Sequence, residues 1–172
     1  MSDQPERSRT IEWEDPKRLL EPLRTLSGLE FLQKIVRREL PGPPISALMD
    51  FALVEVTPGR AVFAGRPAEF HYNPIGVVHG GLAATLLDSA MGCAVQSMLA
   101  VGFGYTTLEI KVNFVRALTA DTGPVRCEAT VMFMGRRTAT AEGRLVDGAG
   151  KLCAHATTTC IVLPPAAAER SS

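Results

Sequence analysis

The sequence predicts an α+β fold in which one antiparallel sheet curls round a single long, buried helix. The segment 82–99 contains no proline and only one glycine, and its apolar residues lie all the way round rather than on one stripe. Such a pattern is typical of a helix enclosed by protein. Runs of alternating residues form one hairpin before this helix and four strands in a meander after it. The short links between the runs imply antiparallel pairing.

An N-terminal amphipathic helix is expected ahead of the sheet. Ser27 and Glu30 fit a capping box, and the helical pattern after them ends at Pro41. Further upstream, Asp15 and Pro16 fit the N-cap and the first residue of a short helical turn. The helix has one apolar stripe, formed by Leu29, Leu32, Ile35, Val36 and Leu40.

The strand pattern starts after Ile45, where the period of the apolar residues changes. Residues 51–56 alternate, Pro58 and Gly59 form a turn, and 60–65 is the returning strand of a hairpin. The strands expected after the central helix are 105–115, 125–134, 138–146 and 152–163. A sheet curled round one helix leaves its outer face open, and dimerisation would cover that face.

The 172 residues correspond to one domain. We expect a flexible N-terminal extension at 1–26, a single domain at 27–163 and a disordered tail at 164–172. The first fifteen residues are polar and contain no apolar core of the signal-peptide kind.

Charge and composition exclude several classes of function. The 18 basic residues balance 18 acidic ones, so no overall field attracts nucleic acid or an anionic membrane. The four cysteines are widely spaced and form no CxxC pair, which favours buried free thiols in a reducing compartment. No ligand spacing links the three histidines to the cysteines, and we expect no metal site.

The apolar segment 80–104 is nearly long enough to span a membrane. Asp88 lies near its middle, at a cost of roughly 2.5–3.5 kcal/mol on insertion scales. Gln96 and Ser97 add to that cost, and no basic cluster flanks the segment. We therefore expect a soluble, cytoplasmic protein without a membrane partner.

Asp88 is the single carboxylate of the predicted central helix. A buried carboxylate must be paired, protonated or in contact with ligand and water. No Lys or Arg lies between Ala68 and Val101, so any basic partner comes from elsewhere in the fold. In one interpretation Asp88 is a structural residue bonded to Thr85, to Ser89 or to a donor from a distant part of the chain. In the other it is a catalytic carboxylate beside a glycine-rich helix start, whose free N–H groups stabilise developing negative charge.

Two motifs resemble those of a known family. The first is Asn73 followed by His79-Gly80-Gly81 and then Asp88, and the second is the strand-like run at 107–114. Together they resemble the PaaI-type hotdog-fold acyl-CoA thioesterases of the 4HBT-like thioesterase superfamily, over roughly residues 27–163. The resemblance implies the hotdog fold, in which an antiparallel sheet wraps round one long central helix.

The resemblance also implies roles for individual residues. Asp88 would act as general base or nucleophile on the thioester carbonyl, and the Gly80 N–H would be the oxyanion donor. Asn73 and His79 would orient the site and the side of the leaving thiolate. Thr107, from the facing subunit, would help to place the attacking water. A thioester is electrophilic enough for one carboxylate and one helix N-terminus to suffice.

Each of these roles has a structural alternative. His79 could only cap the helix or bond to the turn backbone. Gly80 and Gly81 could be required only because the helix starts close to the sheet. Thr106 is the rival of Thr107 as the hydroxyl near the carboxylate.

The substrate implied is an acyl-CoA with an apolar or aromatic acyl group. Coenzyme A is part of the substrate, and no separate cofactor is expected. The acyl pocket would be lined from the central helix and from residues 45–51, and arginines in turns could bind the coenzyme A phosphates, although such arginines are often simply solvated. The residues assigned to substrate binding are Gly81, Leu87, Met91, Arg116, Arg136 and Arg137, with Val95 as a further pocket residue.

The resemblance implies a homodimer, or a tetramer as a dimer of dimers, with sites at the subunit interface. Two alternatives to hydrolysis stay open. A hydratase or dehydratase of the same fold would need a paired histidine and acid for proton shuttling, and Asp88 does not form such a pair in the sequence. A non-catalytic protein of the same fold would bind or sense acyl-CoA. A thioester carried by a carrier protein is also a possible substrate.

Overall fold

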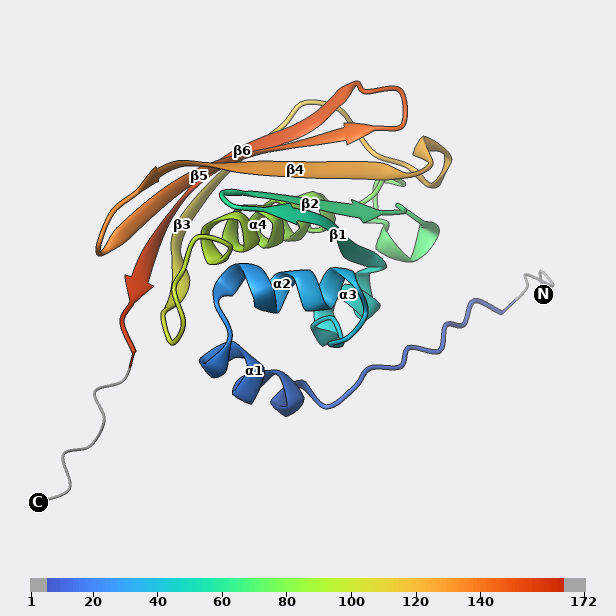
Figure 1. Cartoon of the computed structure of the whole chain (residues 1–172). Helices are drawn as coiled ribbons and strands as arrows, with labels where there is room; N and C mark the ends of the chain where they lie inside the picture. Colours follow the sequence, from blue (N-terminus) through green and yellow to red (C-terminus); the bar gives the residue numbers. More distant parts are fainter. Residues whose placement is uncertain (1–5, 166–172) are drawn as a thin grey trace, which may run out of the picture.

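The computed structural model describes residues 6–165, which form one curled sheet round a central helix. Figure 1 shows helix α4 on the concave side of the sheet, with α2 on the other side of α4. The sheet has six antiparallel strands in the order β1-β2-β4-β5-β6-β3. The α+β class and the hotdog arrangement expected from the sequence are confirmed. The strands are β1 (Phe51–Thr57), β2 (Arg60–Gly65), β3 (Gly104–Phe114), β4 (Val125–Met134), β5 (Thr138–Asp147) and β6 (Leu152–Leu163).

The helices include one that the sequence did not predict. Among the described residues, four are α-helices: α1 (Leu20–Thr25), α2 (Gly28–Val36), α3 (Pro44–Met49) and α4 (Gly80–Gln96). Three more in the same part of the chain are short 3₁₀ turns: η1 (Pro16–Leu19), η2 (Glu69–His71) and η3 (Ala120–Thr122). Helix α3 stands where a strand pattern was expected to begin, because Pro44 starts a helical turn and Asp50 ends it in the left-handed conformation with φ 54°.

The strand order differs from the predicted meander. Strand β3 does not pair with β4, its successor in the chain. It lies at the far edge beside β6, with Gly104 opposite Leu163 and Phe114 opposite Ala154. Helix α4 carries the chain across the concave face before β3 begins, and β4 then returns to the side of β2 (Figure 1). Alternation within a strand does not encode which strand will be its neighbour, so only the crossing of the helix decides this order.

Helix α4 is long and apolar, as predicted, and its packing face is almost fully buried. Small residues on β4 and β5 allow the sheet to approach the helix closely. A Cβ at Gly143 would lie 3.1 Å from Leu87 Cδ2 and 3.2 Å from Met91 Cγ. The buried residues of the helix include Leu82, Ala83, Leu86, Leu87, Ala90, Met91, Ala94 and Val95. The helix is not enclosed all round, however, because Asp88 is exposed in this chain.

The predicted capping box at the start of α2 is confirmed. Ser27 Oγ accepts from the Glu30 N–H, and the Glu30 side chain accepts from the Ser27 N–H. The start of α2 also contacts the end of α4, since the Gly28 N–H donates to Leu99 O at 3.0 Å. The division into an extension at 1–26, a domain and a tail stays a prediction. Residues 16–25 are helical here, and positions 1–5 and 166–172 lie outside the described residues.

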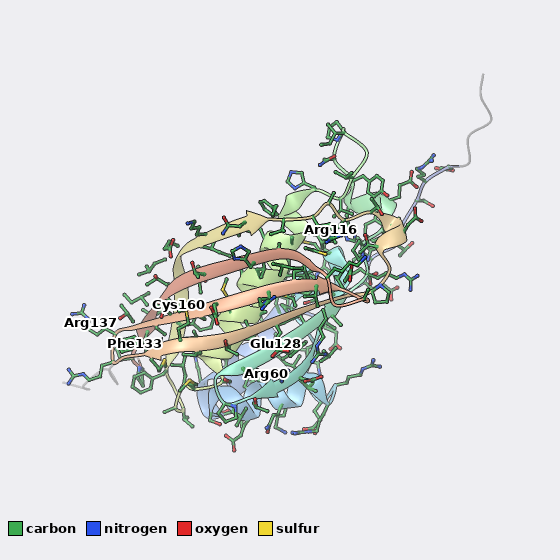
Figure 2. All side chains as sticks on the ribbon, turned by 90° about the horizontal axis from the view of Figure 1, so that it is seen from above. Arg60, Arg116, Glu128, Phe133, Arg137 and Cys160 are labelled. Carbon is green, nitrogen blue, oxygen red and sulfur yellow. The ribbon has the colours of Figure 1, made fainter. Side chains whose placement is uncertain are left out.

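The outer face of the sheet carries charges that pair with one another. Arg60 donates from Nε and Nη2 to Glu128 at 2.8 Å each and from Nη1 to Glu55 at 3.2 Å (Figure 2). Arg126 completes the network with a 2.8 Å bond to Glu55. Around this network the outer face presents paired charges, and dimerisation over the outer face stays a prediction. Within residues 6–165, no helix is long and apolar enough to cross a membrane.

Candidate active site

Asp88 and Thr107 meet on the open side of α4. The Thr107 hydroxyl donates to Asp88 Oδ1 at 2.9 Å, and both residues belong to the same chain. Two expectations are corrected here, because Asp88 is exposed rather than buried in this chain, and Thr107 reaches it without a facing subunit. Thr106, the rival hydroxyl, is exposed, and no bond from it to Asp88 occurs in the described part of the chain.

A bulge in β3 places Thr107 toward the helix. The pairing of β3 with β6 shifts register between Thr107 and Glu109, opposite Cys160 and Thr159. At such a bulge two residues of one strand oppose one residue of its neighbour, and the strand twists locally. Leu108 is consequently 58% exposed, while Thr107 turns toward Asp88. The alternation that the sequence suggested over 107–114 is broken at this point.

Two thiols and one phenol near Asp88 are protonated. Burial, together with the Asp88 charge, raises the pKa of the Cys93 thiol to about 12. Burial also raises the pKa of the Cys160 thiol and of the Tyr105 phenol. All four cysteines are free, as expected, and three of them are fully buried. No thiolate therefore competes with the Asp88 carboxylate as a nucleophile near neutral pH.

A second group of predicted residues lies at the start of α4. His79 is the N-cap, and its Nδ1 accepts from the Gly81 N–H at 2.8 Å. A Cβ at Gly81 would lie 2.8 Å from that same Nδ1, and a Cβ at Gly80 would lie 3.1 Å from the Phe114 ring. These contacts support the structural alternatives for all three residues, since His79 caps the helix and both glycines permit close contacts. The Gly80 N–H belongs to the first turn, where a helix leaves its donors without an internal partner.

Asn73 shapes the loop that leads into this helix start. Its Oδ1 accepts from the Ile75 N–H at 3.1 Å, and its own N–H donates to Val77 O at 2.8 Å. Gly76 closes the turn with φ 80°, a conformation that favours glycine. The loop tip is prominent, with Ile75 82% exposed.

The two groups of predicted residues form separate half-sites within one chain. Gly80 and Asp88 are eight residues apart on α4, which corresponds to about 12 Å along the helix axis. A carbonyl carbon and its oxygen are bonded to each other, so one thioester cannot contact both residues in the same chain. The half-site of Asp88 and Thr107 and the half-site of His79 and Gly80 are each well formed but distant from one another.

Two cavities flank the start of α4. The first, of about 390 Å³, lies between α3, η2 and the N-terminal segment, and includes Leu48, Phe70, His79 and Gly81 in its walls. The second, of about 450 Å³, lies beside β3, and is lined by residues that include His79, Gly80, Phe114 and Arg116. Phe70 and Phe114 are wall residues that were not predicted from the sequence. Both are large aromatic side chains that remain exposed, and this exposure can be recognised only from the structure.

The residues predicted to bind substrate are not brought together. Gly81 lines the first cavity and Arg116 lines the second. Leu87 and Met91 are fully buried against the sheet, with Val95 also in the core, and they line neither of these two cavities. Arg136 and Arg137 lie in the β4–β5 hairpin, and Figure 2 shows Arg137 and Arg116 at opposite ends of the sheet.

Comparison with known sequences identifies relatives over part of the chain. The family model described as "Thioesterase superfamily" matches residues 75–154. The SSO1253 protein of Saccharolobus solfataricus, named as an esterase by inference, is 33% identical over 87 residues, which is 51% of this chain and 56% of that protein. The VNG_1336C protein of Halobacterium salinarum is 44% identical over 62 residues, 33% of this chain and 41% of that protein. The chain thus spans about half the length of the curated relatives it matches.

Solved structures match over nearly their whole length. The conserved protein PA5202 of Pseudomonas aeruginosa has 35% identity and a TM-score of 0.66, over 71% of this chain and 95% of that one. A single-substitution mutant of the phenylacetic acid degradation protein PaaI from Thermus thermophilus has 30% identity and a TM-score of 0.63, over 69% and 98%. Because these relatives share at least 30% identity with the chain and are matched over nearly their whole length, the chain belongs to the thioesterase superfamily.

Proposed function

We propose that this protein hydrolyses the thioester of an acyl-CoA, giving a free acid and coenzyme A. The observation that carries the proposal is the hydrogen bond between Thr107 and Asp88 on the open face of α4, in a chain of the thioesterase superfamily. An exposed carboxylate held by a single hydroxyl is available to water and to substrate. A carboxylate kept only for structure would be bonded on more sides.

The complete site is proposed to need two copies of the chain. The half-site with Asp88 lacks a helix start, and the half-site with Gly80 lacks a carboxylate. Strand β3 is an edge strand with unpaired backbone groups on one side, and it exposes Leu108 by 58% and Phe114 by 59%. Two-fold pairing of this edge with a second copy would cover both side chains and yield two equivalent sites. A homodimer is the smallest assembly with this property, and a tetramer would contain two of them.

The chemistry follows from these positions. The Gly80 N–H, at the positive end of α4, donates to the carbonyl oxygen as negative charge develops on it. Asp88 then either removes a proton from water, whose oxygen bonds to the carbonyl carbon, or attacks that carbon itself to give an anhydride that water hydrolyses. In both routes the C–S bond breaks and the thiolate of coenzyme A leaves and takes up a proton. Thr107 orients the carboxylate throughout, and His79 and Asn73 hold the helix start.

The substrate is proposed to extend on both sides of the helix start. Arg116, in the second cavity, is suited to a phosphate of coenzyme A. Figure 2 shows Arg137 at the opposite end of the sheet from Arg116, and Arg136 precedes Arg137 in the same hairpin, so in one chain we do not expect them to bind the same phosphate group as Arg116. They remain candidates only for a nucleotide that extends from the partner's half of a site.

The first experiment measures release of free thiol from acetyl-CoA, a long-chain acyl-CoA and an aromatic acyl-CoA, with wild type beside Asp88→Asn. We expect turnover in the wild type and a loss in kcat of roughly 100- to 10,000-fold in the variant, the range for a general acid–base group. The fold should be intact, because Asp88 is exposed and its replacement is close in shape. Thermal unfolding checks this point.

Asp121→Asn is a matched control, since Asp121 lies in η3 and lines neither half-site. It should leave turnover unchanged. Full activity of Asp88→Asn would contradict the role of this carboxylate. If the wild type bound acyl-CoA in calorimetry without hydrolysing any thioester, the non-catalytic binding protein would replace the enzyme as the best interpretation.

A further inference from the structure

The N-terminal segment docks on the body of the protein through alternate residues. Residues 7–11, here called the strap, are joined to α3 by hydrogen bonds of Arg9. In an extended chain, alternate side chains point the same way, so Arg7, Arg9 and Ile11 share the inward side. Arg7 Nε donates to Glu69 Oε1 at 2.8 Å, and Ile11 is the half-buried residue of the strap. The Arg7 pair is largely exposed and contributes little by itself.

Arg9 makes the principal contacts of the strap. Its Nη2 donates to Ala47 O at 2.9 Å and its Nη1 donates to Leu48 O at 3.0 Å, at the end of α3. The guanidinium also lies 4.0 Å from the centroid of the Phe70 ring in η2. The Arg9 side chain thus links the strap to both α3 and η2, which are distant from it in the sequence.

The first cavity lies beneath the strap. Arg9 and Ile11 of the strap line it together with Leu48, Met49 and Phe70. At its inner end it reaches His79 and Gly81, next to the N–H proposed to polarise the thioester. Its volume of about 390 Å³ falls within the range of pockets that hold small organic molecules.

The lining of this cavity suits an uncharged group. His71 accepts from the Ala68 N–H at its Nδ1, at 3.0 Å, so the Nε2 that lies 3.0 Å from Met49 O is the donor. Burial lowers the pKa of His71, which keeps the ring neutral at pH 7. The Arg9 charge is directed to two carbonyl oxygens and an aromatic face. Apart from His79, the remaining wall is apolar, in contrast to the second cavity with its Arg116.

We propose that the strap is the outer wall of the acyl-group pocket, and that Ile11 and Arg9 determine which acyl groups this enzyme accepts. This inference rests on the proposed thioesterase function. The acyl group enters the apolar cavity, while the coenzyme A arm leaves on the side of Arg116. Ile11 contacts the acyl group and limits its size. Arg9 is a positioning residue, because it fixes the strap at the distance from α3 that leaves the cavity open.

The test compares acyl groups on the same coenzyme A, so that effects on the coenzyme A side cancel. We measure kcat/KM for phenylacetyl-CoA and for acetyl-CoA in Ile11→Trp and Thr10→Trp. Thr10 is the exposed neighbour on the outward side of the strap, and it adds the same bulk away from the cavity. Ile11→Trp should lower the ratio of phenylacetyl-CoA to acetyl-CoA at least tenfold, as expected when a pocket loses space of a few methylene groups. Thr10→Trp should change the ratio less than twofold.

Arg9→Ala provides a second measurement. It should raise KM for phenylacetyl-CoA several-fold while leaving kcat on acetyl-CoA within twofold, because the strap loosens but the reacting groups stay in place. Arg7→Ala, which removes only the exposed ion pair, is its control. Rescue by Arg9→Lys should be partial, since a lysine cannot bond two carbonyls as a planar fork.

The outcomes separate this inference from the function on which it rests. Unchanged ratios in Ile11→Trp and Arg9→Ala, with normal hydrolysis of acetyl-CoA, would overturn the strap proposal and leave the thioesterase intact. If no thioester is hydrolysed, the proposed function fails, and calorimetric affinities for the same two acyl-CoAs replace the kinetic ratios. The strap proposal then requires that Ile11→Trp lower the affinity for phenylacetyl-CoA, relative to that for acetyl-CoA, at least tenfold. An unchanged ratio of the two affinities would overturn it.

Discussion

Thr107 shows how strongly one residue of the site depends on a local irregularity. An unbroken β3 would alternate regularly past Leu108, and the bulge at this point changes where both neighbours point. Thr107 then donates to Asp88, whereas Leu108 becomes an exposed apolar residue at the sheet edge. The same bulge therefore brings the Thr107 hydroxyl to the Asp88 carboxylate and exposes Leu108 for the proposed contact with a second copy.

Removing the Thr107 hydroxyl should impair turnover without unfolding the protein. Thr107→Val keeps the shape of the side chain but loses a hydrogen bond to a charged group, worth about 1.5–3 kcal/mol. We expect kcat to fall roughly 10- to 100-fold on that scale, with little change in KM. Thr107→Ser keeps a hydroxyl and should retain most activity. Thr106→Val is the control, and an equal loss in that variant would argue against a specific role for the bond.

At the scale of elements, β3 and α4 are in close contact where Tyr105 packs against Gly92. The Tyr105 side chain lies in a notch at Gly92, one helical turn after Asp88. A Cβ at Gly92 would lie 2.2 Å from Tyr105 Oη, and 2.9 Å from Cζ of the same ring. The partly buried ring packs between the strand and the helix, so it has little freedom to move. This contact sets the spacing of the two elements that carry Thr107 and Asp88.

Filling that notch should destabilise the protein and displace the site. Gly92→Ala gains helix propensity of about 1 kcal/mol, but overpacking of this kind costs roughly 1–3 kcal/mol or more. We expect net destabilisation in urea unfolding and a reduced kcat. Tyr105→Leu removes the clashing atoms, so the double variant should be more stable than the sum of the single effects predicts. Additive effects would show that the ring is not what excludes a side chain at position 92.

The elements themselves were largely predictable from the sequence, and the exceptions have physical causes. The bounds predicted for β2, β4 and β6 agree with the structure, because each has a clear alternation and turn residues at its ends. Helix α3 was missed because its six residues are too few to show a helical period. The predicted position of β3 in the strand order was wrong, because the path of α4 decides which strand lies beside it.

At the scale of the whole molecule, the position of the charges indicates which surface is free for assembly. The outer face of the sheet is an ion-paired surface around Arg60 and Glu128 (Figure 2). Exposed apolar side chains occur on β4, at Met132 and Phe133, and on the edge strand β3, at Leu108 and Phe114. That edge adjoins the open face of α4, so an assembly through it would join the half-sites.

Mixing two inactive variants tests whether each site takes one half from each of two chains. Asp88→Asn removes the carboxylate, and Gly80→Pro removes the proposed oxyanion donor at a position where proline is compatible with a helix start. Each homodimer should be nearly inactive. After dissociation and random reassociation, half of the dimers are mixed and each has one intact site, so about one quarter of wild-type activity should return.

Light scattering before and after mixing verifies that the variants assemble like the wild type. A failure to recover activity in mixed dimers that do form would contradict the two-chain site. Recovery in a preparation that remains monomeric would contradict it as well, since no exchange of half-sites would then be possible.

The amino-acid sequence by itself determined the local features of this protein. The central helix, its glycine-rich start, most of the strands and the motif containing Asp88 all depend on backbone chemistry and periodicity within short segments. Tertiary structure alone decided the strand order, the bond from Thr107 to Asp88, the separation of the half-sites and the strap over the first cavity. These features join residues distant in the chain, and the crossing of α4 and one bulge decide which of them meet.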